Sequence, residues 1–347
     1  MRAALGFRPI QIRVVLGECC VCCCGRPAQR SSCLECGCSL FAKRPHSLAL
    51  TGAVIGQTEG MNDSEVLRAQ LANGQPVLMP GVWDPLSALV AAEAGFEVAF
   101  LSGYAVAGSY LGMPDVGLLT QTEVVDVARR VHSAVPGLAL VVDADTGYGN
   151  PINTIRTVQL WEQAGAAGMF LEDQVFPKKC GHMVGKQVVP REEWLAKLRA
   201  VIDHRTSLFV TARTDARAMI GLDEAIERAR MARDVGADAL FIEAPQSIAE
   251  MEQIAAALPG CTLVANMAEA GMTPLLTPAE LGEIGFSLIV SPVSGLFSAV
   301  QALRDSFALL RQHGTLRDYR DRLVDFSSFT ELVGLPAVQQ TERAYPG

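Results

Sequence analysis

The chain has 347 residues, half of them hydrophobic, and a formal net charge of −8. The first sixty residues hold seven Lys and Arg against three acids, so the remaining chain carries 22 basic and 34 acidic residues. This acidic body argues against a nucleic-acid-binding protein. No apolar run approaches the ~18 residues that span a bilayer, so we expect a soluble protein.

Residues 1–60 differ in composition from the rest and hold eight of the ten cysteines. The spacing of Cys33, Cys36 and Cys38 could supply zinc thiolates, whereas the excess of arginine over acids is typical of a targeting segment. A third interpretation is that translation starts at Met61, which leads directly into a capped helix. We expect residues 1–60 to be a disordered or non-native extension. The body, with two cysteines, has no disulfide framework and is expected to be cytoplasmic.

From residue 76 the body alternates short apolar runs with amphipathic stretches. Eight runs predict buried strands, at Val77–Met79, Val98–Ser102, Leu138–Val142, Gly168–Leu171, Leu208–Ala212, Ala239–Ile242, Leu263–Ala265 and Leu288–Val290. Helices are predicted between them, for example at Thr122–Ser133, Asn153–Ala164, Arg191–His204 and Leu222–Val235. This alternation indicates an α/β fold with a parallel sheet, and eight units predict a closed (β/α)8 TIM barrel. We place the catalytic barrel at residues 61–316 and a C-terminal helical segment at 317–347.

Polar or charged residues follow six consecutive predicted strands. They are Ser102-Gly103-Tyr104, Asp143 with Asp145, Glu172-Asp173, Arg213-Thr214-Asp215, Glu243 and Asn266. In a (β/α)8 barrel the residues after the strands meet at the C-terminal face, where active sites lie. A single acid after a strand often caps the next helix, but six such positions predict one shared site.

Asp143 and Asp145 are two residues apart on a segment expected to be extended, so both carboxylates would point the same way. With Glu172 nearby, these hard oxygen ligands suit Mg²⁺, with Mn²⁺ as an alternative, and leave room for substrate oxygens. A metal here would hold and polarise a 2-hydroxy or 2-oxo acid. The alternative interpretation is an Asx-turn at the end of the strand.

Further substrate contacts are predicted from donors at neighbouring strand ends. Arg213 offers a bidentate fork for a substrate carboxylate, and a structural ion pair with Glu243 is compatible with that role. Asn266 and the backbone amides of Gly103 and Tyr104 can donate to substrate oxygens.

Cys180 lies in a long connection, residues 174–189, that is too polar to be strand or core. A loop of this size after a barrel strand often closes as a lid that excludes water. Lys178, Lys179 and His182 are expected to lower the pKa of the thiol, which makes Cys180 a candidate acid or base. An incidental surface cysteine is the alternative.

Over residues 62–346 the sequence resembles the isocitrate lyase/phosphoenolpyruvate mutase superfamily. The segments that carry the resemblance are Ser102–Tyr104, Leu111–Asp115, Val142–Gly147, Leu171–Gln174, Lys178–His182, Ala212–Ala216 and Ala265–Asn266. The Lys-Lys-Cys-Gly-His segment is similar to that of the lyase branch. There the cysteine exchanges a proton with the enolate or aci-carboxylate carbon after C–C cleavage.

The resemblance implies an Mg²⁺-dependent enzyme, usually a homotetramer that exchanges C-terminal helices between subunits. It adds Asp115 to the metal site and Ser102, Gly181 and Glu243 to the substrate site. It also implies that Tyr104, Lys178 and His182 act with Cys180 in catalysis.

We therefore predict a carbon–carbon lyase that cleaves a 2-hydroxy di- or tricarboxylate, of the 2-alkylmalate or 2-methylisocitrate type, to a 2-oxo acid and a carboxylate. The alternatives are an oxaloacetate hydrolase or decarboxylase and a carboxyphosphonoenolpyruvate mutase-like enzyme. A non-catalytic barrel is a third class, disfavoured because a binding module does not need the metal, thiol and arginine groups together. The expected partners are a small carboxylate and further copies of the chain.

Overall fold

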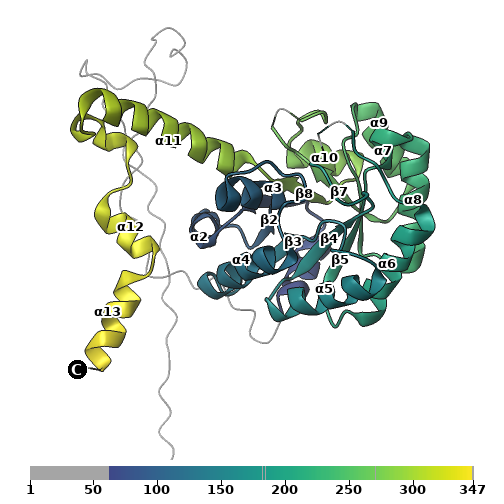
Figure 1. Ribbon diagram of the computed structural model, residues 1–347, viewed down its shortest axis with the longest axis horizontal. Coiled ribbons are helices and arrows are strands. Elements are labelled where there is room, and N and C mark those ends of the chain that lie inside the picture. Colours follow the sequence, from purple (N-terminus) through teal and green to yellow (C-terminus); the bar gives the residue numbers. More distant parts are fainter. Residues whose placement is uncertain (1–61, 182, 184, 270, 346–347) are drawn as a thin grey trace, which may run out of the picture. The chain divides into compact units, whose positions relative to one another are not determined.

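The computed structural model describes residues 62–181, 183, 185–269 and 271–345, all of them within one unit, residues 53–347. Eight parallel strands form a closed barrel in chain order (Figure 1). They are β1 (Val77–Val82), β2 (Val98–Leu101), β3 (Ala139–Asp143), β4 (Gly168–Glu172), β5 (Phe209–Thr214), β6 (Ala239–Ile242), β7 (Thr262–Asn266) and β8 (Leu288–Ser291). The predicted α/β barrel and all eight predicted strands are confirmed; the end of β1 differs most, at Val82 instead of Met79.

Helices cover the outside of the barrel. They are α2 (Pro85–Glu93), α4 (Gln121–Ala134), α5 (Pro151–Gln163), α6 (Arg191–His204), α8 (Leu222–Val235), α9 (Ile248–Ala257) and α10 (Pro278–Ile284). Shorter segments follow β2 and β5, namely α3 (Gly103–Val106), the π-helix η1 (Ala107–Leu111) and α7 (Ala216–Met219). Helix α4 shows how the sequence specifies them. Thr120 and Glu123 form its capping box, and the side chains buried on one face are Val124, Val127, Ala128 and Val131.

The strands are apolar because they are covered on both sides. Every residue of β3, β4 and β5 is buried, as expected for strands between outer helices and the barrel interior. The register of β4 on β5 pairs Glu172 with Arg213. Strand pairing therefore places an acid and a base side by side at the C-terminal end of the barrel.

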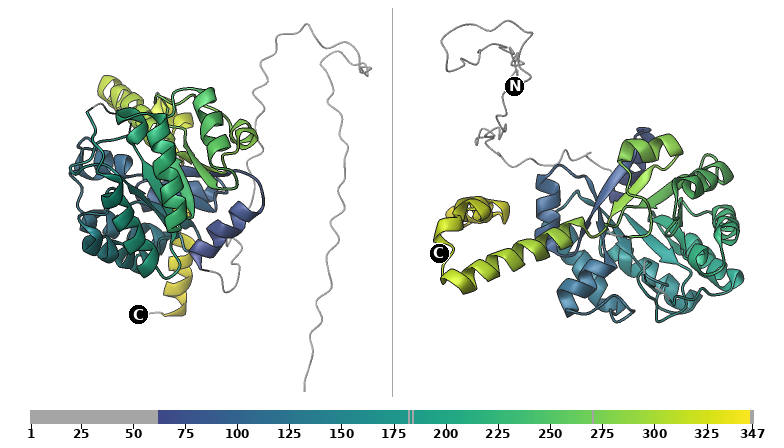
Figure 2. Two further views of the ribbon diagram at one scale, coloured as in Figure 1. Left: turned by 90° about the vertical axis from the view of Figure 1, so that its right-hand side faces the viewer. Right: turned by 90° about the horizontal axis from the view of Figure 1, so that it is seen from above.

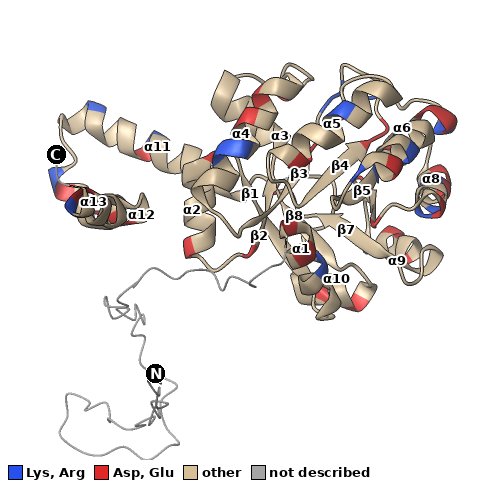
Figure 3. Cartoon of the chain, turned by 90° about the horizontal axis from the view of Figure 1, so that it is seen from below, with Lys and Arg blue, Asp and Glu red and all other residues tan. Residues whose placement is uncertain are grey.

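Aromatic side chains fill the barrel interior. Phe170 lies between Phe100 and Phe241, with ring centroids 4.9 and 5.6 Å apart, and these rings come from alternate strands, as in the layered core of such barrels. At the opposite, N-terminal end, helix α1 (Asp63–Ala72) lies across the barrel (Figure 3) and buries Leu67 in the same cluster. The predicted cap of this helix is confirmed, since the Asn62 side chain accepts a hydrogen bond from the Glu65 amide.

After β8 the chain forms α11 (Ser294–His313), the 3-10 segment η2 (Arg317–Arg322), α12 (Phe326–Leu332) and α13 (Leu335–Ala344). None of the residues in these elements is buried, and α11 leads away from the barrel (Figure 2). Large apolar side chains are exposed along them, with Phe307 63% and Phe326 84% accessible. This C-terminal arm, α11–α13, thus carries apolar surface that the barrel does not cover.

Two predictions concern residues that the structure does not describe. The Cys-rich extension, residues 1–60, and His182 both lie outside the described ranges. Within those ranges, no helix combines the length and the apolar composition needed to cross a membrane.

Candidate active site

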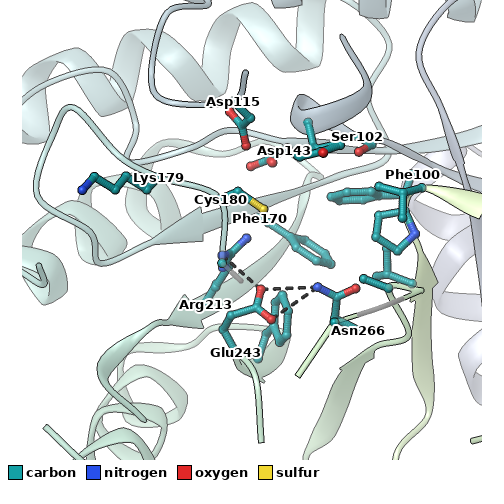
Figure 4. Close-up of a pocket in the computed structure, with 18 of the residues that line it drawn as sticks. Phe100, Ser102, Asp115, Asp143, Phe170, Lys179, Cys180, Arg213, Glu243 and Asn266 are labelled. Carbon is teal, nitrogen blue, oxygen red and sulfur yellow. Dashed lines mark hydrogen bonds and ion pairs between the residues drawn. The ribbon is translucent and has the colours of Figure 1, made fainter. Parts of the chain in front are cut away.

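A pocket of about 260 Å³ opens at the C-terminal end of the barrel (Figure 4). The predicted site residues that line it are Ser102, Tyr104, Asp115, Asp143, Lys178, Cys180, Gly181, Arg213, Glu243 and Asn266. Gly103, Asp145 and Glu172 are buried and adjoin residues of this lining, namely Asp143, Lys178 and Arg213. The structure thus brings together residues that are far apart in the chain, whereas the roles assigned to them stay predictions.

Lys178 and two acids form a first charged cluster, called here the Lys178 cluster. The Lys178 Nζ lies 2.7 Å from Asp115 Oδ1 and 2.8 Å from Asp145 Oδ1. Burial lowers the pKa of Lys178, but Asp145, Asp143 and Asp115 together raise it well above its ordinary value. Burial also raises the pKa of Asp145 to about 7, against the opposing effect of Lys178. The lysine therefore stays charged and holds the acids together.

The chain turns after β3, where an extended segment was predicted. Asp143 ends the strand, but Asp145 has a φ of 47°, in the left-handed region, and its amide donates to Asp143 Oδ1 at 3.1 Å. The prediction of an extended geometry is wrong, and the Asx-turn considered as its alternative is present. Its cause is local, because the short Asp side chain satisfies an amide that has left the strand ladder. Both carboxylates nevertheless remain at the site.

The segment after β2 approaches Asp143 closely. A Cβ atom on Gly103 would lie 2.9 Å from Asp143 Oδ2, so this position requires glycine. The Ser102 Oγ accepts a hydrogen bond from the Ala105 amide at 3.3 Å and caps α3. The amides of Gly103 and Tyr104 belong to the first turn of α3, where no helical carbonyl is in reach. Their predicted use as donors to a substrate therefore agrees with the local structure.

Arg213 and three acids form a second charged cluster, the Arg213 cluster. Arg213 Nε lies 3.0 Å from Asp215 Oδ2 and 3.3 Å from Glu172 Oε2, and Arg213 Nη2 lies 3.0 Å from Glu243 Oε2. Asn266 Nδ2 donates to Glu243 Oε1 at 3.3 Å. The ion pair with Glu243 is thus present in the ligand-free protein. A substrate carboxylate would share the guanidinium with acids already in contact with it.

The net pKa shifts of Glu172 and Asp215 in this cluster have opposite directions. Burial raises the pKa of Glu172 well above its ordinary value, although Arg213 opposes the shift. Burial also favours a higher pKa for Asp215, but Arg213 and Lys186 outweigh it and leave the pKa lowered. Asp215 is therefore the firmly ionised partner of Arg213, and Glu172 is the acid most easily protonated.

The connection between β4 and α6 is more buried than predicted. Gln174 pairs with Val188 in an isolated antiparallel bridge, and Lys178 and Lys186 are 3% and 4% exposed. The expectation that this segment is too polar for the interior is wrong for these lysines, because acids distant in sequence neutralise them. The amide of Cys180 donates to the carbonyl oxygen of Asp115 at 3.2 Å. Cys180 is held at the pocket by backbone contact and is half-buried.

Several residues of the site were not predicted. Asp215 was expected after the fifth strand but was given no role in the site. Lys186, which contacts Asp215 beside the Arg213 cluster, was not predicted. Apolar side chains form one wall of the pocket, namely Phe100, Phe170, Phe241, Val290, Pro292, Val293 and Phe297. The alternate-strand spacing of the phenylalanines was the available signal for the barrel interior.

The residues present fit a hard divalent cation. Asp115, Asp143, Asp145 and Glu172 offer carboxylate oxygens, the ligands that Mg²⁺ prefers, and Glu172 Oε1 is buried without a hydrogen-bond partner in the described structure. The ammonium of Lys178 already lies between two of these acids. Among the described residues no three acidic, His or Cys side chains converge as a finished ligand set. Metal binding would therefore require these carboxylates to move closer to one another.

A closed barrel with acids, an arginine and a thiol in one pocket at its strand ends has the architecture of a barrel enzyme. A family model described as phosphoenolpyruvate phosphomutase matches residues 67–311. The petal death protein of Dianthus caryophyllus is 47% identical over 271 residues, which cover 78% of this chain and 85% of that protein. The 2,3-dimethylmalate lyase of Eubacterium barkeri is 42% identical over 287 residues, 82% of this chain and 99% of that protein.

Solved structures agree with these relationships. An oxaloacetate acetylhydrolase bound to 3,3-difluorooxalacetate superposes with a TM-score of 0.78 at 35% identity, over 82% of this chain and 98% of that chain. A phosphonopyruvate hydrolase in complex with oxalate and Mg²⁺ has a TM-score of 0.75 at 29% identity, over 83% of this chain and 100% of that chain.

The chain belongs to the phosphoenolpyruvate mutase/isocitrate lyase superfamily. It is a lyase-type enzyme of that superfamily. The resemblance inferred from its motifs is confirmed.

Proposed function

We propose that the protein is a Mg²⁺-dependent lyase that cleaves the C2–C3 bond of a 2-hydroxy di- or tricarboxylate of the 2-alkylmalate or 2-methylisocitrate type. The products are a 2-oxo acid and a carboxylate. The observation that supports this most is the shared pocket, in which Asp143, Arg213 and Cys180 approach one cavity from three different segments. Such an arrangement suits a substrate with charge at both ends and a carbon atom that must accept a proton.

The proposed site residues form two groups, one at each end of the pocket. Asp143, Asp145, Glu172 and Asp115 would hold Mg²⁺, which supplies polarisation of the substrate carboxylate and its neighbouring oxygen. At the other end Arg213 would bind the second carboxylate. The smaller donors around the substrate oxygens would be Ser102, Gly103, Tyr104, Gly181 and Asn266, with Glu243 orienting Asn266 and Arg213.

The chemistry that we propose has two proton transfers. A base accepts the proton of the 2-hydroxyl group, and Tyr104 contacts that hydroxyl group during this step. The oxygen electrons form the new carbonyl, the C2–C3 bond breaks, and its electron pair stays on C3 as an enolate or aci-carboxylate. The thiol of Cys180 then gives its proton to C3 and becomes a thiolate. Lys178 and His182 would support this step as charged neighbours.

The pocket favours a dicarboxylate with an apolar substituent over a tricarboxylate. Among the described residues that line it, the cations are Lys178, Lys179 and Arg213. Lys178 lies among the acids of the metal end, Arg213 forms the other end, and the Lys179 Nζ donates to the Gly185 carbonyl. The opposite wall contains Val293 and Phe297 and offers a third carboxylate no cation. An alkyl group would be buried there with a favourable transfer free energy.

A second candidate is hydrolysis or decarboxylation of oxaloacetate. The structural similarity to an oxaloacetate acetylhydrolase with an inhibitor bound favours it. A carboxyphosphonoenolpyruvate mutase-like activity is the remaining alternative, which the family model leaves open. All three use a small acid with at least two anionic groups and would need the same two charged clusters.

We further propose a homotetramer in which the C-terminal helices are exchanged between neighbouring subunits. The support is the C-terminal arm, whose exposed Phe307, Phe326 and Val338 would be covered by another copy. Light scattering should give four times the chain mass; a monomer at micromolar concentration would contradict the proposal. We also propose that the enzyme is cytoplasmic, because residues 61–347 contain two cysteines and therefore no disulfide framework.

The test is a substrate screen with added Mg²⁺. Candidates are 2,3-dimethylmalate, 2-ethyl-3-methylmalate, 2-methylisocitrate, isocitrate and oxaloacetate, scored for 2-oxo acid, glyoxylate and oxalate. We expect turnover of a 2-alkylmalate that EDTA abolishes. Oxalate from oxaloacetate with no cleavage of any 2-hydroxy acid would favour the second candidate.

A further inference from the structure

Lys186 is a buried lysine for which neither the metal site nor the substrate contacts give a role. It lies near the end of the connection from β4 to α6, and 1% of its side chain is exposed. Its Nζ donates to the carbonyl oxygen of Gly181 and to the Asp215 carboxylate. The ammonium thus joins the segment that carries Cys180 to the end of β5.

The contact with Asp215 affects Arg213. Asp215 is fully buried. Arg213 contacts both of its carboxylate oxygens, with Nε 3.0 Å from Oδ2 and Nη2 3.3 Å from Oδ1, and Lys186 shares Oδ1. Glu172 and Glu243 also contact Arg213. Without Lys186, one guanidinium would face three acids. With Lys186, a second cation shares the charge of one of these acids, Asp215.

The contact with Gly181 affects Cys180. A Cβ atom on Gly181 would lie 2.6 Å from Glu243 Oε2 and 2.7 Å from Arg213 Nη2. The backbone at Gly181 therefore rests directly on the Arg213–Glu243 ion pair. A donor that fixes the Gly181 carbonyl also fixes the neighbouring Cys180 at the pocket.

We propose that Lys186 is a positioning residue that holds Cys180–Gly181 against the pocket and shares the charge of Asp215 with Arg213, so that the guanidinium can bind a carboxylate ligand. One ammonium thereby couples the position of the thiol to the strength of the anion site. The positioning of Cys180–Gly181 does not depend on which reaction the enzyme catalyses. The effect on Arg213 rests on the carboxylate-binding role proposed for that residue.

The test compares Lys186→Met with Lys179→Met in the full-length protein. Both remove a lysine from the same connection, but the Lys179 Nζ donates to Gly185 within that connection, whereas Lys186 reaches the barrel. In the ligand-free protein, hydrogen exchange of residues 176–181 and alkylation of Cys180 should accelerate roughly tenfold or more in Lys186→Met, the loss expected for a hydrogen bond from a charged group. Lys179→Met should change exchange little. Because Lys179 adjoins Cys180, it also controls for loss of charge near the thiol.

Anion binding is measured separately, with oxalate as the probe in the presence of Mg²⁺. The Kd for oxalate should rise by a similar factor in Lys186→Met. Faster exchange with an unchanged Kd would overturn the effect on Arg213 and retain the positioning of Cys180. Exchange and alkylation at wild-type rates would overturn the whole proposal.

Asp215→Asn provides a second route if Lys186→Met fails to fold. It preserves shape but removes the charge that holds Lys186, so it should also accelerate exchange at 176–181. Where Lys186→Met does fold, the two effects in the double variant should be clearly less than additive, because both substitutions break the same contact. Fully additive effects would show that the contact does not couple the two residues. Neither exchange nor alkylation depends on turnover, so a wrong substrate assignment would leave these results unaffected.

Discussion

The two charged clusters at the mouth of the barrel differ in how their cations are supplied. In the Lys178 cluster the cation comes from a connecting loop, and the acids Asp115 and Asp145 come from a loop and a turn. In the Arg213 cluster the cation is a strand residue, and its pairing opposite Glu172 is set by the β4–β5 register. Loop residues can be displaced without breaking the barrel, whereas strand residues cannot.

This difference indicates what each cluster can do. A lysine held by acids on movable segments can give way to another cation, so the Lys178 cluster suits an exchangeable Mg²⁺. A guanidinium fixed by strand register keeps its place, so the Arg213 cluster suits recognition of an anion in one orientation. The predictions below test this division.

The largest effect is expected from Asp145→Ala, in the Lys178 cluster. Removing this carboxylate should lower turnover by roughly 10³-fold or more, because a bound metal contributes several kcal/mol to such reactions. Activity and Mg²⁺ affinity by calorimetry are the measurements. Asp126→Ala, on the exposed face of α4, is the control. Full activity of Asp145→Ala in EDTA would remove the metal from the mechanism.

Cys180→Ser tests the thiol that lies between the clusters. General acid–base groups contribute ~10²–10⁴-fold, so kcat should fall by that range while KM changes much less. Cys261→Ser, at the start of β7 and outside the pocket, should behave as wild type. If Cys180→Ser retains full activity on every substrate, protonation by the thiol is excluded.

Arg213→Lys sharpens the distinction, because it keeps the charge and removes the planar fork. We expect KM to rise roughly tenfold or more, as bidentate contacts to a carboxylate are lost, with Mg²⁺ affinity unchanged. Arg217→Lys is the control, since Arg217 pairs with Glu250 outside the pocket. A loss of Mg²⁺ affinity in Arg213→Lys would show that the clusters are not separate.

Charges at the other end of the barrel should affect stability and not turnover. His132 Nδ1 lies 3.2 Å from Asp63 Oδ2, and this contact raises the pKa of His132 above 6.5 more than burial lowers it. Because the pKa of His132 is higher in the folded than in the unfolded state, its protonation stabilises the folded protein fully below about pH 6.5. This stabilisation is lost as the pH rises through the pKa of His132 in the folded state. Asp63→Asn should therefore lower Tm at pH 5.5 and have little effect at pH 8.5. Equal losses at both pH values would contradict the pairing.

The smallest effect is expected from removing residues 1–60. We propose that this region is dispensable, because Asn62 already provides the cap of α1. A chain of residues 61–347 should match the full chain in kcat and Tm, and the full chain should hold no stoichiometric zinc by elemental analysis. Aggregation of the shorter chain, or bound zinc, would assign the Cys-rich region a structural role.

The sequence predicted the barrel and the residues at its strand ends because both follow from periodicity. Arg213 and Glu243 could be placed together without knowing a single contact, since parallel strands end at one face. The turn at Asp145 could not be predicted, because its left-handed conformation depends on a bond to Asp143. Nor could the burial of Lys178 and Lys186, whose partners Asp115 and Asp215 are 63 and 29 residues away.

The wall of the pocket and the C-terminal arm share one helix. Phe297 lines the pocket and lies 6.3 Å from the ring of Tyr104, while Phe307 is exposed further along α11. A partner that covered this arm would therefore also restrain the helix that carries Phe297. Specific activity should then depend on enzyme concentration, with dilution loosening the wall before the barrel unfolds.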